Sequence, residues 1–213
     1  MTQLETITEG IRAHFVAVDE VREKAYKVSR ELTRMSAHTI RAVHRSEWET
    51  AEEMLTQARQ VVQDLVSSTR PFPQIHWAGY TQDCMKEYTE AELTYALVRQ
   101  QPLRGPDELH VDEAAWLNGL AEAATELRRR ILDIIRQGHE AEAEMLLSAM
   151  DDVYSILVTF DFRDAITGGL RRRTDTVRAV LERTRGDVTT SLRQQSLEKA
   201  LARVEAHLKE QGE

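Results

Sequence analysis

Two stretches of the chain carry closely spaced glutamates, residues 86–97 (KEYTEAELTYAL) and residues 116–130 (WLNGLAEAATELRRR). Residues three or four positions apart project from the same side of a helix. Two such helices packed side by side would therefore gather four carboxylates around one point. Like charges this close disfavour each other's ionised form unless a cation lies among them. The four candidates are Glu87, Glu90, Glu122 and Glu126.

A site built only from carboxylates favours a hard divalent ion. Oxygen ligands suit Mg²⁺ or Mn²⁺, which bind through one or two carboxylates together with water and substrate phosphate. Such an ion can activate water and stabilise the transition state of phosphodiester cleavage. The spacing alone leaves a second interpretation open, in which the acids face solvent and bind nothing.

Other chemistries lack the residues they require. No Gly-rich phosphate loop follows a strand, because the sequence predicts no strand. A zinc site needs clustered Cys and His, whereas this chain has one Cys and seven scattered His. A di-iron carboxylate bundle needs Glu-x-x-His pairs, and the sequence contains none.

The composition favours a folded protein made of few, long elements. The chain has 213 residues, of which 41% are hydrophobic and 30% charged, with only nine Gly and four Pro to form turns. The single cysteine, Cys84, forms no internal disulfide and fits a reducing compartment. No run of about 18 apolar residues is present. We expect a cytoplasmic protein with no signal peptide and no membrane partner.

Apolar residues recur at helical spacing along almost the whole chain, and no segment alternates as a strand would. The pattern predicts an all-α, single-domain bundle of about seven helices over residues 1–213. We expect Gly10 to mark the start of the first helix, Ser46 to cap the second helix, and Gly186 to separate the last two helices. The predicted helices cover about 4–45, 46–67, 73–101, 111–137, 139–160, 170–185 and 188–210.

Small residues lie beside the second glutamate pair. Ala115, Gly119 and Ala123 form a patch next to Glu122 and Glu126. Small side chains let a neighbouring helix approach closely, which would bring both acids into the seam between two helices. Asp133 falls inside the apolar stripe of the same predicted helix and needs a partner if it is buried.

Charge is distributed unevenly along the chain. The net charge is −8, yet residues 170–193 hold seven Arg against three acids, a local balance of +4. Residues 106–127 hold six acids and no Lys or Arg. A basic stripe also runs along the first predicted helix and is either a solvated face or a surface for phosphates. Its members are Arg34, His38, Arg41 and Arg45.

Three segments resemble the translin family, and specifically its translin-associated factor X branch. Residues 28–45 (VSRELTRMSAHTIRAVHR) resemble the first-helix motif of that branch. KEYTEA, residues 86–91, resembles the family's E-Y-x-E-A segment, which carries two catalytic glutamates. Residues 116–129 (WLNGLAEAATELRR) resemble the block in which an aspartate is followed four residues later by a glutamate, and Glu122 stands here at the aspartate position.

Two further segments share the resemblance. Residues 170–188 (LRRRTDTVRAVLERTRGDV) resemble the family's basic C-terminal segment. Ile75-His76-Trp77 resembles its histidine-tryptophan contact with nucleic acid. The resemblance therefore covers most of the chain and includes both glutamate stretches.

The resemblance implies a translin-like fold and a Mg²⁺-dependent endoribonuclease that cleaves single-stranded or short duplex RNA, with single-stranded DNA as a further ligand. It also implies a hollow homo-oligomer, a hexamer or octamer built from one chain type, with active sites facing the interior. Glu87, Glu90 and Glu122 would ligate the ion, Glu126 would ligate it or position a water, and Glu31 is an additional candidate. The RNA contacts would come from Arg34, His38, Arg41, Arg45, His76, Arg171, Arg172 and Arg173.

Two other functional classes stay open on the sequence. The first is a non-catalytic, translin-like oligomer that binds single-stranded RNA or DNA, which a Glu122 unable to reach the metal would favour. The second is a helical scaffold whose apolar faces serve only oligomerisation. RNA cleavage separates the enzyme from the binder, and RNA retention separates the binder from the scaffold.

Overall fold

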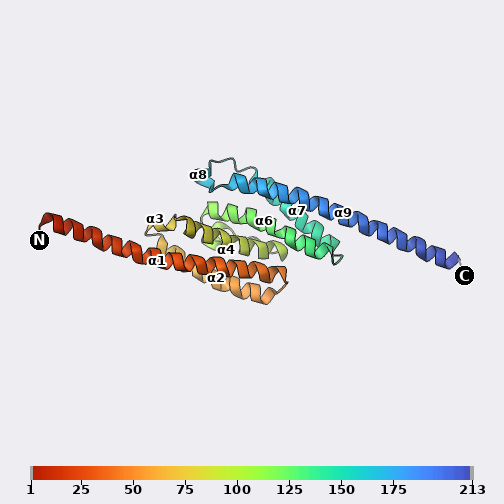
Figure 1. The fold of residues 1–213 in the computed structure, drawn as a ribbon, viewed down its shortest axis with the longest axis horizontal. Helices are drawn as coiled ribbons and strands as arrows, with labels where there is room; N and C mark the ends of the chain where they lie inside the picture. Colours follow the sequence, from red (N-terminus) through yellow and green to blue (C-terminus); the bar gives the residue numbers. More distant parts are fainter. Residues whose placement is uncertain (1, 212–213) are drawn as a thin grey trace. The chain divides into compact units, whose positions relative to one another are not determined.

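The computed structural model describes residues 2–211 and contains nine helices and no strand within that range (Figure 1). The all-α prediction is confirmed, whereas the count of about seven helices is wrong. Three short helices of four residues each fall in predicted breaks or helix ends. The helices are α1 (Gln3–His44), α2 (Trp48–Thr69), α3 (Pro73–His76), α4 (Gly79–Val98), α5 (Pro106–Leu109), α6 (Glu113–Ile135), α7 (Glu140–Leu157), α8 (Asp164–Thr167) and α9 (Leu170–Gln211).

Neither Gly10 nor Gly186 interrupts its helix. The first helix begins at Gln3, where Thr2 and Glu5 form a capping box. The last helix continues through Gly186, so the two helices predicted there are one. An isolated glycine in a helix interior costs only about 1 kcal/mol. Long flanking helical sequence can outweigh that cost, and the glycines therefore failed as boundary signals.

Two other predicted boundaries differ from the structure. Ser46 does not cap α2, because it adopts the left-handed conformation (φ 60°) and Glu47 occupies the N-cap position. The helix predicted from Pro73 is divided into α3 and α4 around Trp77. A hydrogen bond across this break stabilises it, because the Thr81 hydroxyl donates to the Ile75 carbonyl at 2.8 Å.

The described chain forms two compact units. Among residues 2–211, the first unit contains residues 2–123 and 162–170, and the second contains residues 124–161 and 171–211. The expectation of a single domain over residues 1–213 stays a prediction. No helix of the described residues is both long enough and apolar enough to cross a bilayer.

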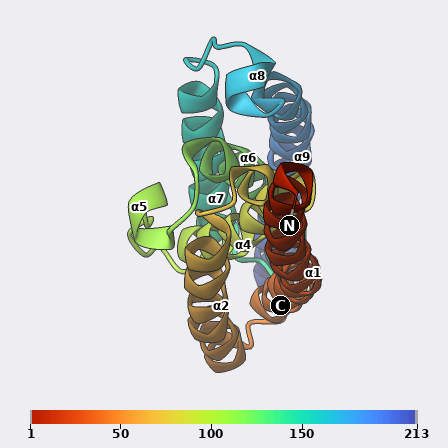
Figure 2. The same ribbon diagram turned by 90° about the vertical axis from the view of Figure 1, so that its left-hand side faces the viewer.

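In the first unit, α1 packs along both α2 and α4 (Figures 1 and 2). The core between these helices contains Leu32, Val62, Met85 and Tyr88, all of which are buried. Cys84 is also part of this core, and burial raises the pKa of its thiol to about 11. The thiol is therefore protonated near neutral pH and acts as a small apolar group.

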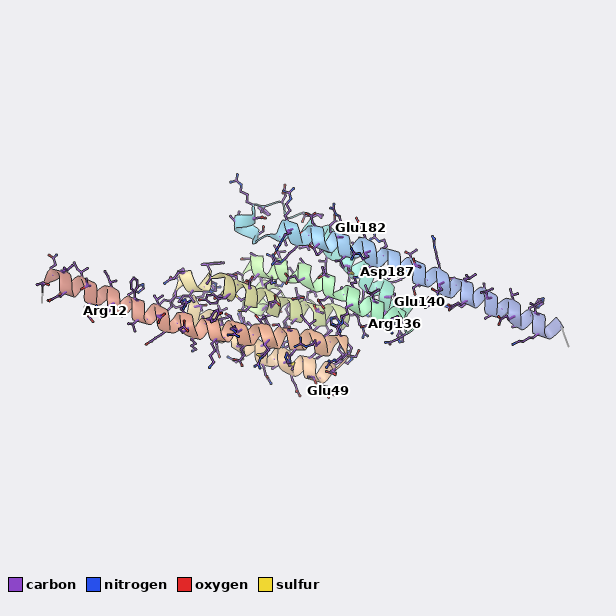
Figure 3. The ribbon with its side chains drawn as sticks, in the orientation of Figure 1. Arg12, Glu49, Arg136, Glu140, Glu182 and Asp187 are labelled. Carbon is purple, nitrogen blue, oxygen red and sulfur yellow. The ribbon has the colours of Figure 1, made fainter. Side chains whose placement is uncertain are left out.

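The N-terminal part of α1 extends beyond this core. Residues 2–17 are exposed, and Arg12 projects from this part of the helix in Figure 3. Apolar side chains with helical spacing nevertheless follow one side of it, which leaves a large apolar stripe uncovered. The exposed members are Leu4, Ile7, Ile11 and Phe15.

In the second unit, ion pairs join three helices. Arg130 at the end of α6 contacts Glu142 of α7 at 2.8 Å, and Arg185 of α9 contacts Asp151 of α7 at 2.7 Å. Asp187, labelled on α9 in Figure 3, pairs with Arg128 of α6 at 2.8 Å. The C-terminal part of α9 leaves a second apolar stripe exposed. Its members are Leu197, Leu201, Val204 and Leu208.

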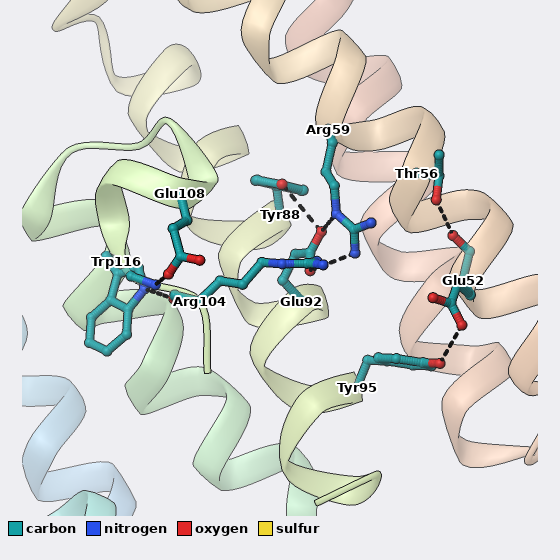
Figure 4. Close-up of polar contacts among 10 residues, drawn as sticks. Glu52, Thr56, Arg59, Tyr88, Glu92, Tyr95, Arg104, Glu108 and Trp116 are labelled. Atoms are coloured by element: carbon teal, nitrogen blue, oxygen red, sulfur yellow. Dashed lines mark hydrogen bonds and ion pairs between the residues drawn. The ribbon is translucent and has the colours of Figure 1, made fainter. Parts of the chain in front are cut away.

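A buried carboxylate ties the segment after α4 to α2 and α4 (Figure 4). Glu92 is 4% exposed and accepts hydrogen bonds from Arg59 at 2.6 and 3.1 Å, from Arg104 at 3.1 Å and from the Tyr88 hydroxyl at 3.2 Å. Burial alone would lower the pKa of Arg59, but the hydrogen bonds and charge of Glu92 outweigh burial and raise it. The guanidinium of Arg59 therefore stays charged near neutral pH.

We predict that Glu92→Gln lowers the free energy of unfolding by about 2–4 kcal/mol, because removing one partner of a buried ion pair leaves the other charge uncompensated. This range allows for the partial exposure of the two arginines, since solvent screens part of their interaction with Glu92. Urea unfolding with circular dichroism measures the change. Glu53→Gln, on the exposed side of α2, is the matched control and should shift stability by less than about 0.5 kcal/mol. Equal unfolding midpoints for the two variants would show that the network contributes nothing.

Candidate metal centre

The candidate site begins with α4, a central helix of the first unit. Every residue from Tyr88 to Ala96 is buried, because α1 and α2 pack against this helix. Glu90 is only 8% exposed, whereas the side chain of Glu87 is 32% exposed. The two carboxylates therefore lie at the border between the core and solvent.

A close approach between α4 and α6 places the third acid. A Cβ atom on Gly119 would lie 2.7 Å from Cβ of Thr89 and 2.9 Å from the carbonyl oxygen of Lys86, distances that real Cβ atoms essentially never show. Only glycine leaves room for the two backbones to come so near. Glu122 lies three residues after Gly119, so it projects from the same side of α6 toward α4. The predicted role of the small-residue patch is confirmed at Gly119.

Three of the four predicted carboxylates meet in this seam. One oxygen from each of Glu87, Glu90 and Glu122 lies within 4.8 Å of the others. Opposite corners of a Mg²⁺ octahedron are about 4.2 Å apart, from metal–oxygen distances of about 2.1 Å. A small closure of the side chains would bring the oxygens to metal-binding distance. The donor set is oxygen only, which fits Mg²⁺ or Mn²⁺.

Lys86 places a cation among these acids. Its ammonium nitrogen lies 2.6 Å from Oε2 of Glu122 and 3.0 Å from Oε1 of Glu87, and its side chain is only 12% exposed. Burial alone would lower the pKa of Lys86, but the hydrogen bonds to Glu122 and Glu87 outweigh burial and raise it. The ammonium is therefore charged near neutral pH. Its presence shows that these oxygens can hold a cation.

The remaining predicted acids lie outside this group. Glu126 follows one turn after Glu122 on α6 and belongs to the second unit, and Glu31 is exposed on α1. Asp133 is only partly buried. Water can solvate its carboxylate, so no buried partner is required.

The predicted basic stripe is exposed along α1. Its four residues step by four, three and four positions and so share one side of the helix. Exposure leaves their charged groups accessible to a ligand or to solvent alike. The exposed members are Arg34, His38, Arg41 and Arg45.

His76 has a different environment from the one its predicted role implies. It is 4% exposed, with Nδ1 3.1 Å from the Thr69 hydroxyl and Nε2 3.0 Å from Oδ2 of Asp112. Trp77, in contrast, is 61% exposed, and the two rings meet edge to face with centroids 5.1 Å apart. The accessible aromatic surface of this pair therefore belongs to Trp77, and the buried ring of His76 contacts it.

The predicted arginine cluster lies at the start of α9 in the second unit. Arg171 and Arg172 are exposed, and Arg173 is half-buried. The three residues follow each other directly, so they point to different sides of the helix. Only part of the cluster can serve one ligand surface.

Two residues of the site region were missed in the sequence. Lys86 directly precedes Glu87, and neighbouring positions on a helix do not face each other, so spacing placed it outside the cluster. The long side chain of Lys86 nevertheless reaches the seam between α4 and α6. Glu92 lies in the same glutamate-rich stretch but was not a candidate, and its carboxylate pairs with Arg59 and Arg104.

The chain matches no family model, but it is similar to several known proteins. An uncharacterised protein of Methanocaldococcus jannaschii is 32% identical over 195 residues, which are 91% of this chain and 86% of that protein. A solved structure of AfC3PO bound to duplex RNA is 31% identical with a TM-score of 0.81, covering 86% of this chain and 95% of that one. Apo-NeC3PO is 17% identical with a TM-score of 0.76, covering 90% of this chain and 98% of that one, and shows a likeness of fold alone.

We predict that Gly119→Ala lowers the free energy of unfolding by about 1–3 kcal/mol, because the added methyl group overpacks the seam between α4 and α6. Helix propensity alone would have the opposite effect, a gain of about 0.5–1 kcal/mol. Gly186→Ala is the matched control, since its Cβ would meet nothing within 4 Å. Urea unfolding compares the two. A stability gain in both variants would contradict the close approach.

Proposed function

Because the chain belongs to the translin family, we propose that it is a Mg²⁺-dependent endoribonuclease resembling the translin-associated factor X branch. The observation that carries this proposal is the convergence of three carboxylates, two from α4 and one from α6, within 4.8 Å. Its proposed substrate is single-stranded or short duplex RNA, and single-stranded DNA is a further proposed ligand. The solved complex of AfC3PO with duplex RNA supports a nucleic-acid substrate.

Glu87, Glu90 and Glu122 would hold the ion, with Mn²⁺ as an alternative to Mg²⁺. A bound divalent ion supplies a more acidic water and a positive charge beside the scissile phosphate. Burial of Glu90 on α4 fixes one ligand, while the partial exposure of Glu87 and Glu122 leaves the site open to a substrate. Glu126 stays a prediction as a fourth ligand or a water-positioning group.

The exposed stripe of α1 is the proposed surface for backbone phosphates. Arg34, His38, Arg41 and Arg45 present their charges along one side of the helix. Contacts to phosphates carry no sequence information, and they weaken as salt rises. The exposed ring of Trp77 offers a platform for a base, since every base has a face that can stack. Arg171, Arg172 and Arg173 stay a separate prediction within the second unit.

We also propose that copies of the chain assemble into a closed homo-oligomer, a hexamer or octamer. The support is the exposed apolar stripe on the N-terminal part of α1, formed by Leu4, Ile7, Ile11 and Phe15. A continuous apolar stripe of this length on a helix is typical of a surface that another helix covers. The exposed stripe at the end of α9 offers a second surface of the same kind.

One observation favours a second candidate, a non-catalytic RNA- or DNA-binding oligomer. Lys86 already pairs with Glu87 and Glu122, so the acid cluster has a cation without any metal. Glu122 also stands where the family has a shorter aspartate. In this alternative the seam is a structural ion-pair cluster, and RNA would bind without being cut.

Cleavage of a labelled single-stranded RNA in Mg²⁺ tests the enzyme. We predict that Glu87→Gln lowers the cleavage rate by on the order of a hundredfold or more, because loss of a metal ligand removes several kcal/mol of transition-state stabilisation. Excess EDTA should abolish cleavage by the wild type.

Asp83→Asn is the matched control, because Asp83 is an exposed acid one turn before Glu87 on the same helix. This variant should cleave at close to the wild-type rate. RNA retained on a filter but left intact by wild type and Glu87→Gln alike would establish the non-catalytic candidate instead.

A further inference from the structure

We propose that Lys86 is a built-in counter-cation that holds the acid cluster closed in the absence of divalent metal, so that metal binding has to displace its ammonium group. This inference rests on the proposed metal-dependent function and adds a regulator of the same site. It concerns the free protein before any RNA binds. Under this proposal, the affinity of the site for metal depends on Lys86 as well as on the three glutamates.

The contacts of Lys86 exceed those of a lysine that only balances surface charge. Its ammonium group bridges two helices, because Glu87 lies on α4 and Glu122 on α6. The side chain is 12% exposed, so its four-carbon stem is held rather than free. Exposed ion pairs in proteins are usually solvated and contribute little. A held, largely buried ammonium between two carboxylates is therefore a defined part of the site.

A divalent ion and the Lys86 ammonium compete for the same two carboxylates, those of Glu87 and Glu122. Glu87 and Glu122 supply two of the three ligand atoms of the cluster and also both contacts of Lys86. Metal–carboxylate bonds of about 2.1 Å require those oxygens to turn toward the ion. An ammonium left within a few ångströms of the ion would also repel it strongly, since little solvent separates them. One cation must leave for the other to bind.

Competition of this kind lowers the apparent affinity for metal. The fraction of molecules with the ammonium displaced sets how much of the intrinsic affinity is realised. Glu87 and Glu122 also keep a cationic partner when no metal is present, which reduces the mutual repulsion of the carboxylates in the seam. Lys86 thus stabilises the metal-free protein and weakens its affinity for the ion.

Direct binding of Mn²⁺, measured by electron paramagnetic resonance on RNA-free protein, tests the proposal. Lys86→Met keeps the length of the side chain and removes its charge. We expect it to bind Mn²⁺ about tenfold more tightly than the wild type, equivalent to about 1.4 kcal/mol. In EDTA it should melt at a lower temperature than the wild type, and Mn²⁺ should raise its melting temperature by more.

Two further variants control for charge and for folding. Lys86→Arg keeps a cation in the seam and should bind Mn²⁺ within about threefold of the wild type. Lys24→Met removes an exposed charge on α1. It should change the affinity for Mn²⁺ by no more than about twofold to threefold, since salt screens distant charges. A role of Lys86 that was merely structural would weaken Mn²⁺ binding in Lys86→Met rather than strengthen it.

Equal or weaker Mn²⁺ binding by Lys86→Met overturns the proposal, as does an equal gain in Lys86→Arg. These results would leave the proposed nuclease intact, since RNA cleavage by the wild type tests it separately. Conversely, if the wild type binds Mn²⁺ but cuts no RNA, the proposed nuclease activity is wrong. The comparison of Mn²⁺ affinity between the wild type and Lys86→Met still decides the role of Lys86. Absence of Mn²⁺ binding by both proteins at millimolar concentration overturns both proposals.

Discussion

The close approach of α4 and α6 at Gly119 is the constraint on which the candidate site depends. Backbone and side-chain atoms of α4 occupy the space that a Cβ atom would need. The two helices can therefore bring carboxylates from both sides of one seam within 4.8 Å. With a larger residue at position 119 the helices would separate, and Glu122 would move away from Glu87 and Glu90. A residue without a side chain thus lets the carboxylates of α4 and α6 come together.

Two ion-pair systems on α4, one buried and one partly exposed, show how similar residues acquire different uses. Glu92 has two arginines and a tyrosine hydroxyl around it, which satisfies its oxygens and joins α2 to the segment after α4. In the seam, Lys86 pairs with Glu87 and Glu122, and one oxygen of each of these acids lies within 4.8 Å of an oxygen of Glu90. Carboxylates this close disfavour each other's ionised form unless a cation lies among them. The first system serves stability, and the second offers a site.

Helical periodicity predicted the all-α class and both helices of the seam, because a pattern sustained over many residues averages out local exceptions. The small residue at 119 also predicted close packing. Boundaries were less predictable, since Gly10 and Gly186 lie inside helices whose neighbours outweigh their weak propensity. Lys86 could not be assigned from spacing, because a long side chain reaches across a seam that its Cα position does not face. The environment of His76 includes a hydrogen bond with Asp112, which lies 36 residues away in the sequence, so spacing could not reveal it.

The central claim is that the oxygens of Glu87, Glu90 and Glu122 form a binding site for a divalent ion. A crystal structure of the protein grown with Mn²⁺, with anomalous diffraction recorded at the manganese edge, tests it most directly. The account predicts an anomalous peak in the seam between α4 and α6, within about 2.3 Å of carboxylate oxygens from both helices. A seam without such a peak at saturating Mn²⁺, with Lys86 still bridging Glu87 and Glu122, would contradict it.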